Sequence, residues 1–159
     1  MANNNYESKI LYGFSDIKVN DTPILGGKSV QVNLEIQTAR ASNKTRDFRW
    51  STVVSANGQM TILGLSSEEM ELLFGYRLIK SVYENELIIT DSFTNKEVEL
   101  SFARKKANGK MIRYYMTVIF SPASIEANTI DGNIAEDNIT LDFEVIKQNG
   151  VYYRQIENI

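Results

Sequence analysis

The sequence predicts a mainly β protein, an antiparallel sandwich or open barrel with one short flanking α-helix. Strand-like runs recur along the chain, and dipeptides that favour tight hairpin turns lie near or between them. Those turn signals are Asn57-Gly58, Asn108-Gly109, Asp131-Gly132 and Asn149-Gly150. A chain of 159 residues without repeats or linkers is expected to form one domain, 1–159, with a polar, mobile N-terminal arm at about 1–8.

Two of the expected strands, 30–38 and 138–146, alternate strictly between apolar and polar residues. In the first, the apolar side that we expect to face the core consists of Val30, Val32, Leu34 and Ile36, and the polar side of Gln31, Asn33, Glu35 and Gln37. The polar side of the second includes Thr140, Asp142 and Glu144. Neither polar side carries a lysine or an arginine. Further strands are expected at 48–55, 59–63, 79–83, 86–90, 97–104, 111–121 and 151–156.

One segment, residues 64–76, departs from the strand pattern and predicts a helix at about 67–74. Ser66 and Glu69 have the spacing of a capping box, in which each side chain bonds the backbone N–H of the other residue. Gly75 is suited to end the helix in a left-handed conformation. The apolar stripe expected to pack against a sheet consists of Met70, Leu73 and Phe74.

The segment 39–47 is predicted to be an overlong loop between two strands, because a hairpin usually needs only about two to five residues. Long loops of this kind usually contact something. The candidate residues for a contact between subunits are Arg40, Lys44, Arg46 and Asp47, and their expected partner is an acidic helix edge on a neighbouring copy, formed by Glu68, Glu69 and Glu71.

Three other interpretations of the sequence compete with a contact between subunits. Phe48 and Trp50, interleaved with the loop's basic residues, resemble a stacking platform for single-stranded nucleic acid, although two aromatic residues on one strand face are more often core. Asp142 and Glu144 have a spacing compatible with a glycosidase pair, but adjacent carboxylates on a strand are far commoner than active sites. A calcium site from Asp131, Asn133, Glu136 and Asp137 lacks the spacing of a known loop.

Composition excludes many kinds of chemistry. The chain has no cysteine and no histidine, which removes thiolate nucleophiles, histidine bases and the usual ligands of zinc, copper and haem. No motif supports a cofactor, and we expect no catalytic or metal-binding residues. The net charge of −3 gives no broad basic surface for nucleic acid. The longest apolar run, at 114–120, is too short to span a bilayer, so no membrane insertion is expected.

Three stretches of the chain, taken in order, resemble the major tail tube proteins of long-tailed bacteriophages. The first is NGQMTILGLSSEEMELLFGY. In the family, an Asn-Gly turn, a strand and a capped helix follow one another in the same order, and this sequence has Phe74 where the family pattern has leucine. The second, VELSFARKKANGKMIRYYMTVIFSP, is similar to a hairpin that closes on Phe and Pro, and DNITLDFEVI with NGVYYRQI resembles the strands that follow. The resemblance covers residues 30–156 approximately.

The resemblance implies a structural virion protein, not an enzyme, that forms hexameric rings stacked into a tail tube. Such a tube encloses a tape-measure protein, meets tail terminator or baseplate proteins, and later conducts double-stranded DNA. It is made in the host cytoplasm and located in the virion tail; contractile tails and type VI secretion tubes share the architecture. We expect the polar sides of strands 30–38 and 138–146 to line the lumen. The alternative is a monomeric OB-like or sandwich module that binds single-stranded nucleic acid or a glycan.

Overall fold

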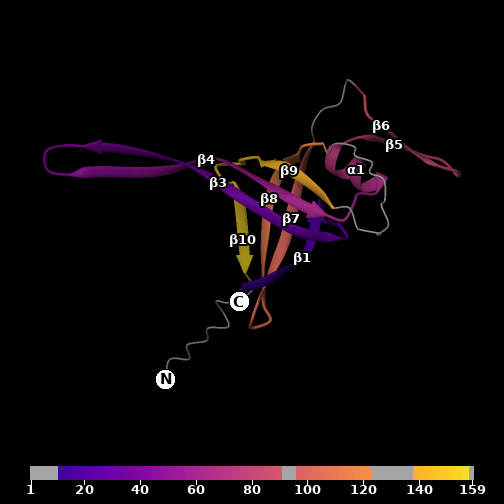
Figure 1. Ribbon diagram of the computed structural model, residues 1–159, viewed down its shortest axis with the longest axis horizontal. Coiled ribbons are helices and arrows are strands. Elements are labelled where there is room, and N and C mark those ends of the chain that lie inside the picture. The colour runs from indigo at the N-terminus through magenta and orange to yellow at the C-terminus, as the bar shows by residue number, and fades with distance from the viewer. Residues whose placement is uncertain (1–10, 91–95, 123–137, 158–159) are drawn as a thin grey trace, which may run out of the picture.

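The computed structural model describes residues 11–90, 96–122 and 138–157, and it confirms a mainly β, antiparallel fold with one short helix (Figure 1). Within this part of the chain the elements follow one another as β1 (Leu11–Val19), β2 (Thr22–Pro23), β3 (Gly27–Ser42), β4 (Asp47–Ile62), α1 (Ser67–Phe74), β5 (Arg77–Lys80), β6 (Asn85–Ile88), β7 (Glu97–Lys106), β8 (Met111–Phe120), β9 (Ile139–Val145) and β10 (Tyr153–Glu157). The helix α1 is too short to cross a membrane, and no longer apolar helix exists among the residues described.

The strands form one large bent sheet and one small hairpin. Neighbouring strands of the large sheet follow the order β2-β1-β7-β8-β9-β4-β3, and β10 pairs with β8. Along one edge of β8, residues 118–120 pair with β9 and residues 112–116 pair with β10. Because the sheet divides there, β9, β4 and β3 turn away from β10 and enclose a core with β7 and β8, as in a sandwich or open barrel. The hairpin β5-β6 stands apart (Figure 1).

The core lies on one face of the bent sheet. Buried side chains come from β4 and β9 on one side and from β7 and β8 on the other, among them Met60, Leu141, Phe143, Leu100, Val118 and Phe120. Phe120 and Phe143 meet edge-on with ring centroids 5.5 Å apart. Each fully buried side chain of this size contributes about 1.5–3 kcal/mol to folding. Leu73 and Phe74 bring α1 into the same cluster.

The helix α1 begins and ends where the sequence predicts. The hydroxyl of Ser66 accepts a hydrogen bond from the backbone N–H of Glu69 at 3.1 Å, and the Glu69 carboxylate accepts one from the backbone N–H of Ser66 at 3.0 Å. Gly75 follows the last turn with φ +75°, a conformation that favours glycine. The capping box is therefore confirmed, and it fixes the N-terminus of a helix too short to be stable by itself.

Replacing Ser66 by alanine is expected to destabilise the protein by about 1 kcal/mol, because an N–H of the first turn loses its acceptor. Ser67→Ala is the matched control, since Ser67 lies one position further on and its hydroxyl is not part of the capping box. Urea unfolding of both variants checks the prediction. An equal loss of stability in the two variants would contradict a specific role for the cap.

Residues 48–55 and 59–63 were predicted as two strands, but residues 47–62 form the single strand β4. The predicted turn at Asn57-Gly58 is therefore wrong. Gly58 lies inside the strand, opposite Val32 of β3 and Phe143 of β9. A Cβ atom at this position would lie 2.5 Å from Cζ of Phe143 and would also meet the carbonyl oxygen of Gln31. Glycine is present here because two neighbours approach the backbone closely.

The predicted loop at 39–47 is also wrong. Strand β3 continues to Ser42 and β4 begins at Asp47, so only residues 43–46 form the connection. The side-chain oxygen of Asn43 accepts hydrogen bonds from the backbone N–H groups of Thr45 and Arg46, at 3.0 and 2.8 Å, which close this turn. The distal part of the hairpin, residues 36–53, projects from the body, and we call it the arm (Figure 1).

The remaining turn predictions have mixed outcomes. Asn108-Gly109 joins β7 to β8, and Asn149-Gly150 lies between the bridged residues Gln148 and Val151, so both are confirmed. Asp131-Gly132 and the N-terminal arm at about 1–8 lie outside the described residues.

The strands β1 and β2 were not predicted. Register shifts interrupt β1, and its Gly13 and Asp16 have positive φ, so it shows no regular alternation.

Candidate functional site

The polar sides of 30–38 and 138–146 lie on one surface of the large sheet, with β4 between them. Gln31 of β3 is opposite Gln59 of β4, which is opposite Asp142 of β9. We call this surface the polar face; its members are Gln31, Asn33, Glu35, Gln37, Ser55, Asn57, Gln59, Thr61, Thr140, Asp142 and Glu144. The candidate lumen residues of the two outer strands are thus brought together on a single surface.

The contribution of β4 to the polar face was not predicted. Ser55, Asn57, Gln59 and Thr61 alternate with Ala56, Gly58, Met60 and Ile62, whose side is buried. That alternation was visible in the sequence, but interpreting Asn57-Gly58 as a turn divided it into two pieces. The signal that identifies these residues is the regular period of two through the dipeptide.

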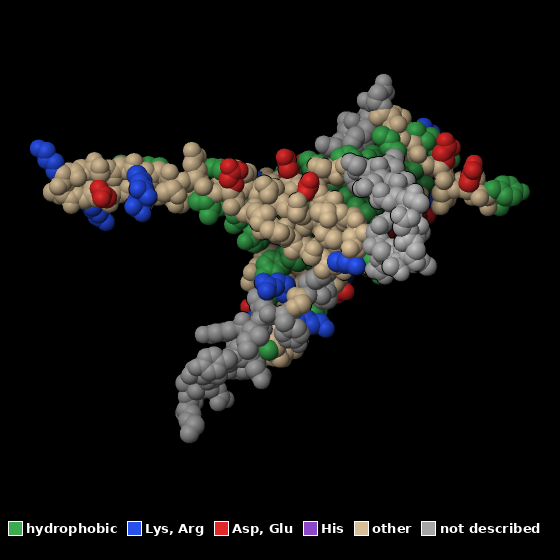
Figure 2. All heavy atoms as spheres, viewed as in Figure 1, with side chains coloured by type: hydrophobic (Ala, Val, Ile, Leu, Met, Phe, Trp, Pro, Cys, Tyr) green, Lys and Arg blue, Asp and Glu red, His purple; other side chains and the backbone are tan. Residues whose placement is uncertain are grey.

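The polar face is exposed except for the half-buried Ser55 and Thr61, and it is hydrogen-bonded across its strands. The hydroxyls of Thr61 and Thr140 lie 3.2 Å apart, and the hydroxyl of Ser55 donates to the Glu35 carboxylate at 2.6 Å. The face carries three carboxylates and no lysine or arginine; acidic side chains are visible along the upper side of the body near the base of the arm (Figure 2). A surface of this chemistry offers a passing polyanion no cation to bind.

One border of the polar face is an unpaired strand edge. In the described part of the chain, β3 pairs only with β4, so the backbone groups along its other side have no strand partner. The strand is 16 residues long, and its central residues, 29–39, include no lysine or proline to prevent pairing with another chain. The edge is therefore a suitable site for addition of a strand from another molecule.

Four apolar side chains were predicted to face the core from β3, and only half of that prediction is confirmed. Val30 and Val32 are half-buried against the core. Leu34 and Ile36 are 40% and 59% exposed, so their assignment to the core of a single chain is wrong. The reason is that β3 leaves the body at this point and continues as the arm, with only β4 beside it.

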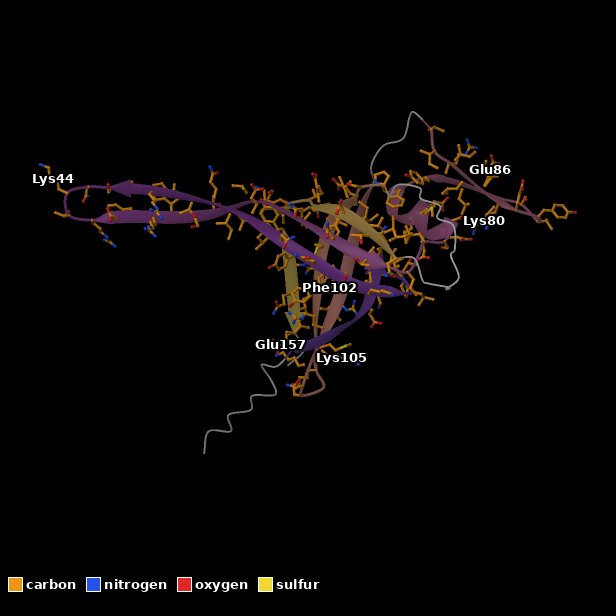
Figure 3. All side chains as sticks on the ribbon, in the orientation of Figure 1. Lys44, Lys80, Glu86, Phe102, Lys105 and Glu157 are labelled. Atoms are coloured by element: carbon orange, nitrogen blue, oxygen red, sulfur yellow. The ribbon has the colours of Figure 1, made fainter. Side chains whose placement is uncertain are left out.

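The arm carries an excess of positive charge at its far end. Arg40 and Arg49 are directly opposite each other on its two strands, an arrangement that is unfavourable without an anion nearby. Neither arginine has a carboxylate partner among the described residues. Lys44 lies at the tip (Figure 3), and the guanidinium of Arg46 lies 5.2 Å from the centre of the Phe48 ring. The arm thus presents guanidinium groups that an acidic surface can pair.

Phe48 and Trp50 were more simply interpreted as core residues, and that interpretation is wrong. They are 43% and 55% exposed, on the side of the arm opposite to Arg40 and Arg49. Each is paired with a small residue, Phe48 with Ala41 and Trp50 with Ala39. The result is a small apolar surface on the arm that its own chain leaves uncovered.

The three acidic residues of the predicted helix edge all have partners within the chain. The Glu68 carboxylate lies 3.4 Å from the Lys80 ammonium, and Glu69 belongs to the capping box. Glu71 accepts a hydrogen bond from the backbone N–H of Leu78 at 3.2 Å. The pKa of Glu68 is lowered by the hydrogen bond from its own backbone N–H and then by Lys80. Glu68 and Glu71 remain exposed, so the edge keeps its negative charge.

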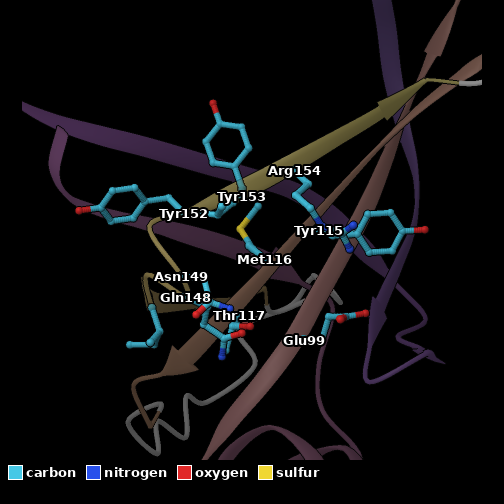
Figure 4. Close-up of a pocket in the computed structure, with 11 residues that line it drawn as sticks. Glu99, Tyr115, Met116, Thr117, Gln148, Asn149, Tyr152, Tyr153 and Arg154 are labelled. Carbon is cyan, nitrogen blue, oxygen red and sulfur yellow. The ribbon is translucent and has the colours of Figure 1, made fainter. Parts of the chain in front are cut away.

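A hollow of about 250 Å³ lies where the turn before β10 meets β7 and β8 (Figure 4). Its lining includes Tyr115, Tyr152 and Tyr153, together with polar side chains such as Glu99 and Gln148. The three tyrosine rings point in different directions and do not form a flat platform (Figure 4). The Arg154 guanidinium covers one of them, at 5.5 Å from the centre of the Tyr115 ring. This arrangement is unlike the parallel aromatic surfaces that stack sugars or bases.

The residues of the two carboxylate alternatives lie in different places. Asp142 and Glu144 are part of the exposed polar face, opposite the amides of Gln59 and Asn57. The proposed calcium loop, residues 131–137, lies outside the described residues. Comparison with models of known protein families gave no match, and comparison with curated proteins gave none either.

Proposed function

We propose that this chain is a structural protein of a bacteriophage virion, whose copies assemble into rings that stack into a tail tube. The polar face lines the bore, and DNA leaves through it after the tape-measure protein. The resemblance to tail tube proteins implies hexameric rings and contacts with tail terminator or baseplate proteins at the tube ends. It also implies that the protein is synthesised in the host cytoplasm and is then located in the virion tail.

The observation that carries the proposal is the absence of cations from the polar face. Each lysine or arginine that contacts a phosphate releases counterions and adds affinity for DNA of any sequence. A bore lined by amides, hydroxyls and a few carboxylates avoids that affinity. The same face borders the free edge of β3, so pairing of this edge with the next copy would extend the lining from one subunit to another.

Exposed apolar side chains support self-association. Leu34, Ile36, Phe48 and Trp50 all lie on the β3-β4 hairpin, and each is at least 40% exposed. Leu34 and Ile36 lie on one side of the hairpin and Phe48 and Trp50 on the other, so each side exposes a pair of large apolar side chains. Contact with a neighbouring copy would cover them and would gain about 25 cal/mol for each Å² of apolar surface removed from water.

The direct test is the oligomeric form of the purified protein at rising concentration, measured by analytical ultracentrifugation and negative-stain electron microscopy. Rings or tubes are expected. A protein that remains monomeric up to millimolar concentration, with no rings on the grid, would overturn the proposal.

Reversal of charge on the arm is expected to weaken assembly. In the double variant Arg40→Glu with Lys44→Glu, the arm would repel the acidic helix edge of the neighbouring copy, and the concentration needed for half-assembly should rise about tenfold. The matched control is Lys105→Glu near the end of β7 with Lys110→Glu in the β7-β8 turn; Lys105 lies away from the arm (Figure 3). Sedimentation velocity compares the two, and equal effects would contradict a specific role for the arm.

A second candidate function is a monomeric module that binds single-stranded nucleic acid. It is favoured by the exposure of Phe48 and Trp50 on one side of the arm, where bases could stack. Arg40 and Arg49 lie on the opposite side, so only Arg46 accompanies the rings. Salt-sensitive binding of an oligonucleotide by a stable monomer, abolished by Trp50→Ala, would favour this candidate over the tube.

A further inference from the structure

The β5-β6 hairpin ends in two large apolar side chains that contact almost nothing. Val82 is 94% exposed and Tyr83 is 97% exposed, the highest values among the exposed large hydrophobic residues described. In Figure 2 this tip is the green group at the end of the molecule opposite to the arm. Turn positions are usually occupied by glycine, asparagine, aspartate, proline or serine. Two bulky apolar residues there indicate a tip built for contact.

The tip is held in one conformation by Ser81. Its hydroxyl accepts hydrogen bonds from the backbone N–H of Tyr83 at 3.3 Å and of Glu84 at 3.0 Å. The backbone N–H of Ser81 also donates to the carbonyl of Glu84 at 2.9 Å. A turn that is already ordered loses little conformational entropy when it binds.

The same chain contains a hollow that suits such a tip. It has a volume of about 250 Å³ and lies between β3 and β10, over β7 and β8. Its lining consists of Val30, Val32, Phe102, Arg104, Tyr114, Met116 and Tyr153. Tyr114 stacks on Phe102 with ring centroids 5.1 Å apart, and Tyr153 meets Tyr114 edge-on at 6.4 Å. We call it the aromatic groove; its three aromatic rings, two valines and methionine offer apolar contacts to a valine and a tyrosine, and Arg104 and the tyrosine hydroxyls supply polar groups.

Charge complements the apolar fit. Arg104 is half-buried in the aromatic groove, and the described residues supply no hydrogen-bond acceptor or carboxylate for its guanidinium. Glu84, next to Tyr83, is exposed and its carboxylate likewise has no partner in the described chain. An incoming carboxylate would gain a charge-assisted hydrogen bond from this guanidinium.

We propose that the Val82-Tyr83 tip of one copy inserts into the aromatic groove of a neighbouring copy, with Glu84 pairing Arg104. The occupant is a second copy of this chain, because the described residues include both an exposed apolar tip beside Glu84 and an aromatic groove that holds Arg104, a side chain of opposite charge. The contact is heterologous, so it joins copies head to tail and can propagate. The inference rests on the assembly proposed above and names one of its contacts.

Cysteine cross-linking tests the contact directly, because the natural chain contains no cysteine. Tyr83→Cys subunits are mixed with Val32→Cys subunits that carry isotope labels, assembled and oxidised, and the linked peptides are identified by mass spectrometry. A disulfide between positions 83 and 32 of different copies is expected. The matched control replaces Val32→Cys by Lys110→Cys, at the exposed β7-β8 turn, and should give no such link.

A charge swap tests the ionic part. Glu84→Arg alone is expected to raise the concentration for half-assembly about tenfold, and mixing with Arg104→Glu subunits should restore it. Assembly that proceeds normally without the 83–32 link, and without sensitivity to Glu84→Arg, would overturn this contact and leave the proposed tube intact. Failure of the natural chain to assemble would instead overturn both.

Discussion

Gly58→Ala is expected to destabilise the protein by about 3 kcal/mol or more, the upper end of the cost of overpacking a core. The added methyl group would meet the carbonyl oxygen of Gln31 and would lie 2.5 Å from the Phe143 ring. The first is backbone of the paired strand, and the second belongs to a side chain that is 1% exposed. Neither neighbour can move without disturbing the register of β3, β4 and β9 or the core beneath them.

The matched control is Gly64→Ala. Nothing lies within 4 Å of a Cβ built at Gly64, and its φ is outside the range that favours glycine. This variant should be neutral or slightly stabilised, because alanine restricts the unfolded chain. Thermal unfolding distinguishes the two: a loss of about 3 kcal/mol corresponds to a fall of about 6–12 °C in Tm for a chain of this size. Similar Tm values for both variants would show that the strands can separate at Gly58 without cost.

The wrong turn prediction at Gly58 also shows why only part of the fold could be predicted from the sequence. Asn-Gly is a strong local signal for a hairpin turn, and two of the predicted Asn-Gly turns are confirmed, at Asn108-Gly109 and Asn149-Gly150. At Asn57-Gly58 the glycine is required by a contact with residues 27 and 85 positions away along the chain. Local turn statistics contain no information about such a contact, so the strand was divided in error.

Features fixed by nearby residues were predicted well. The helix at 67–74 depends on Ser66, Glu69 and Gly75, all within one short segment, and it is found at those residues. The alternation of 30–38 and 138–146 correctly separated the polar from the buried side of 139–145 and of the first half of β3, whereas their common surface depends on pairing with β4. The middle of the arm was missed because residues 39–47 are mostly small, polar or charged, so no apolar alternation marked them as strand. Its length follows from pairing with the opposite strand.

The candidate contact surfaces could likewise be predicted only in part from the sequence. The basic residues of the arm could be listed from the sequence, but the direct opposition of Arg40 and Arg49 depends on register across the hairpin. The aromatic groove was not predicted at all, since its lining comes from β3, β7, β8 and β10. A sequence pattern indicates which side of a strand is apolar. It does not indicate which apolar sides the fold leaves uncovered, and those are the sides that a second copy would cover.

Lysines on the polar face are expected to leave tubes intact and to slow DNA release about tenfold or more. The variant combines Gln31→Lys, Gln37→Lys and Gln59→Lys, three exposed positions whose side chains make no contact with the core. In the proposed tube every ring would then present several cations to the DNA. Each contact of a lysine with a phosphate would add affinity for DNA, whatever its sequence. Because that affinity depends on released counterions, higher salt should restore much of the rate.

The matched control places glutamate at the same three positions. Gln31 and Gln59 are directly opposite each other, so either charge introduces a like-charge repulsion between β3 and β4. At position 59 the glutamate also faces Asp142 of β9, so the glutamate variant is the more strongly repelled of the two. Only the lysine variant should retain DNA. Ejection from purified particles is followed with a dye that reports released DNA, at two salt concentrations, after electron microscopy has verified normal tails. If both variants eject at the natural rate, the polar face is not the bore; if both are slowed equally, charge repulsion within the wall explains the effect and affinity for DNA does not.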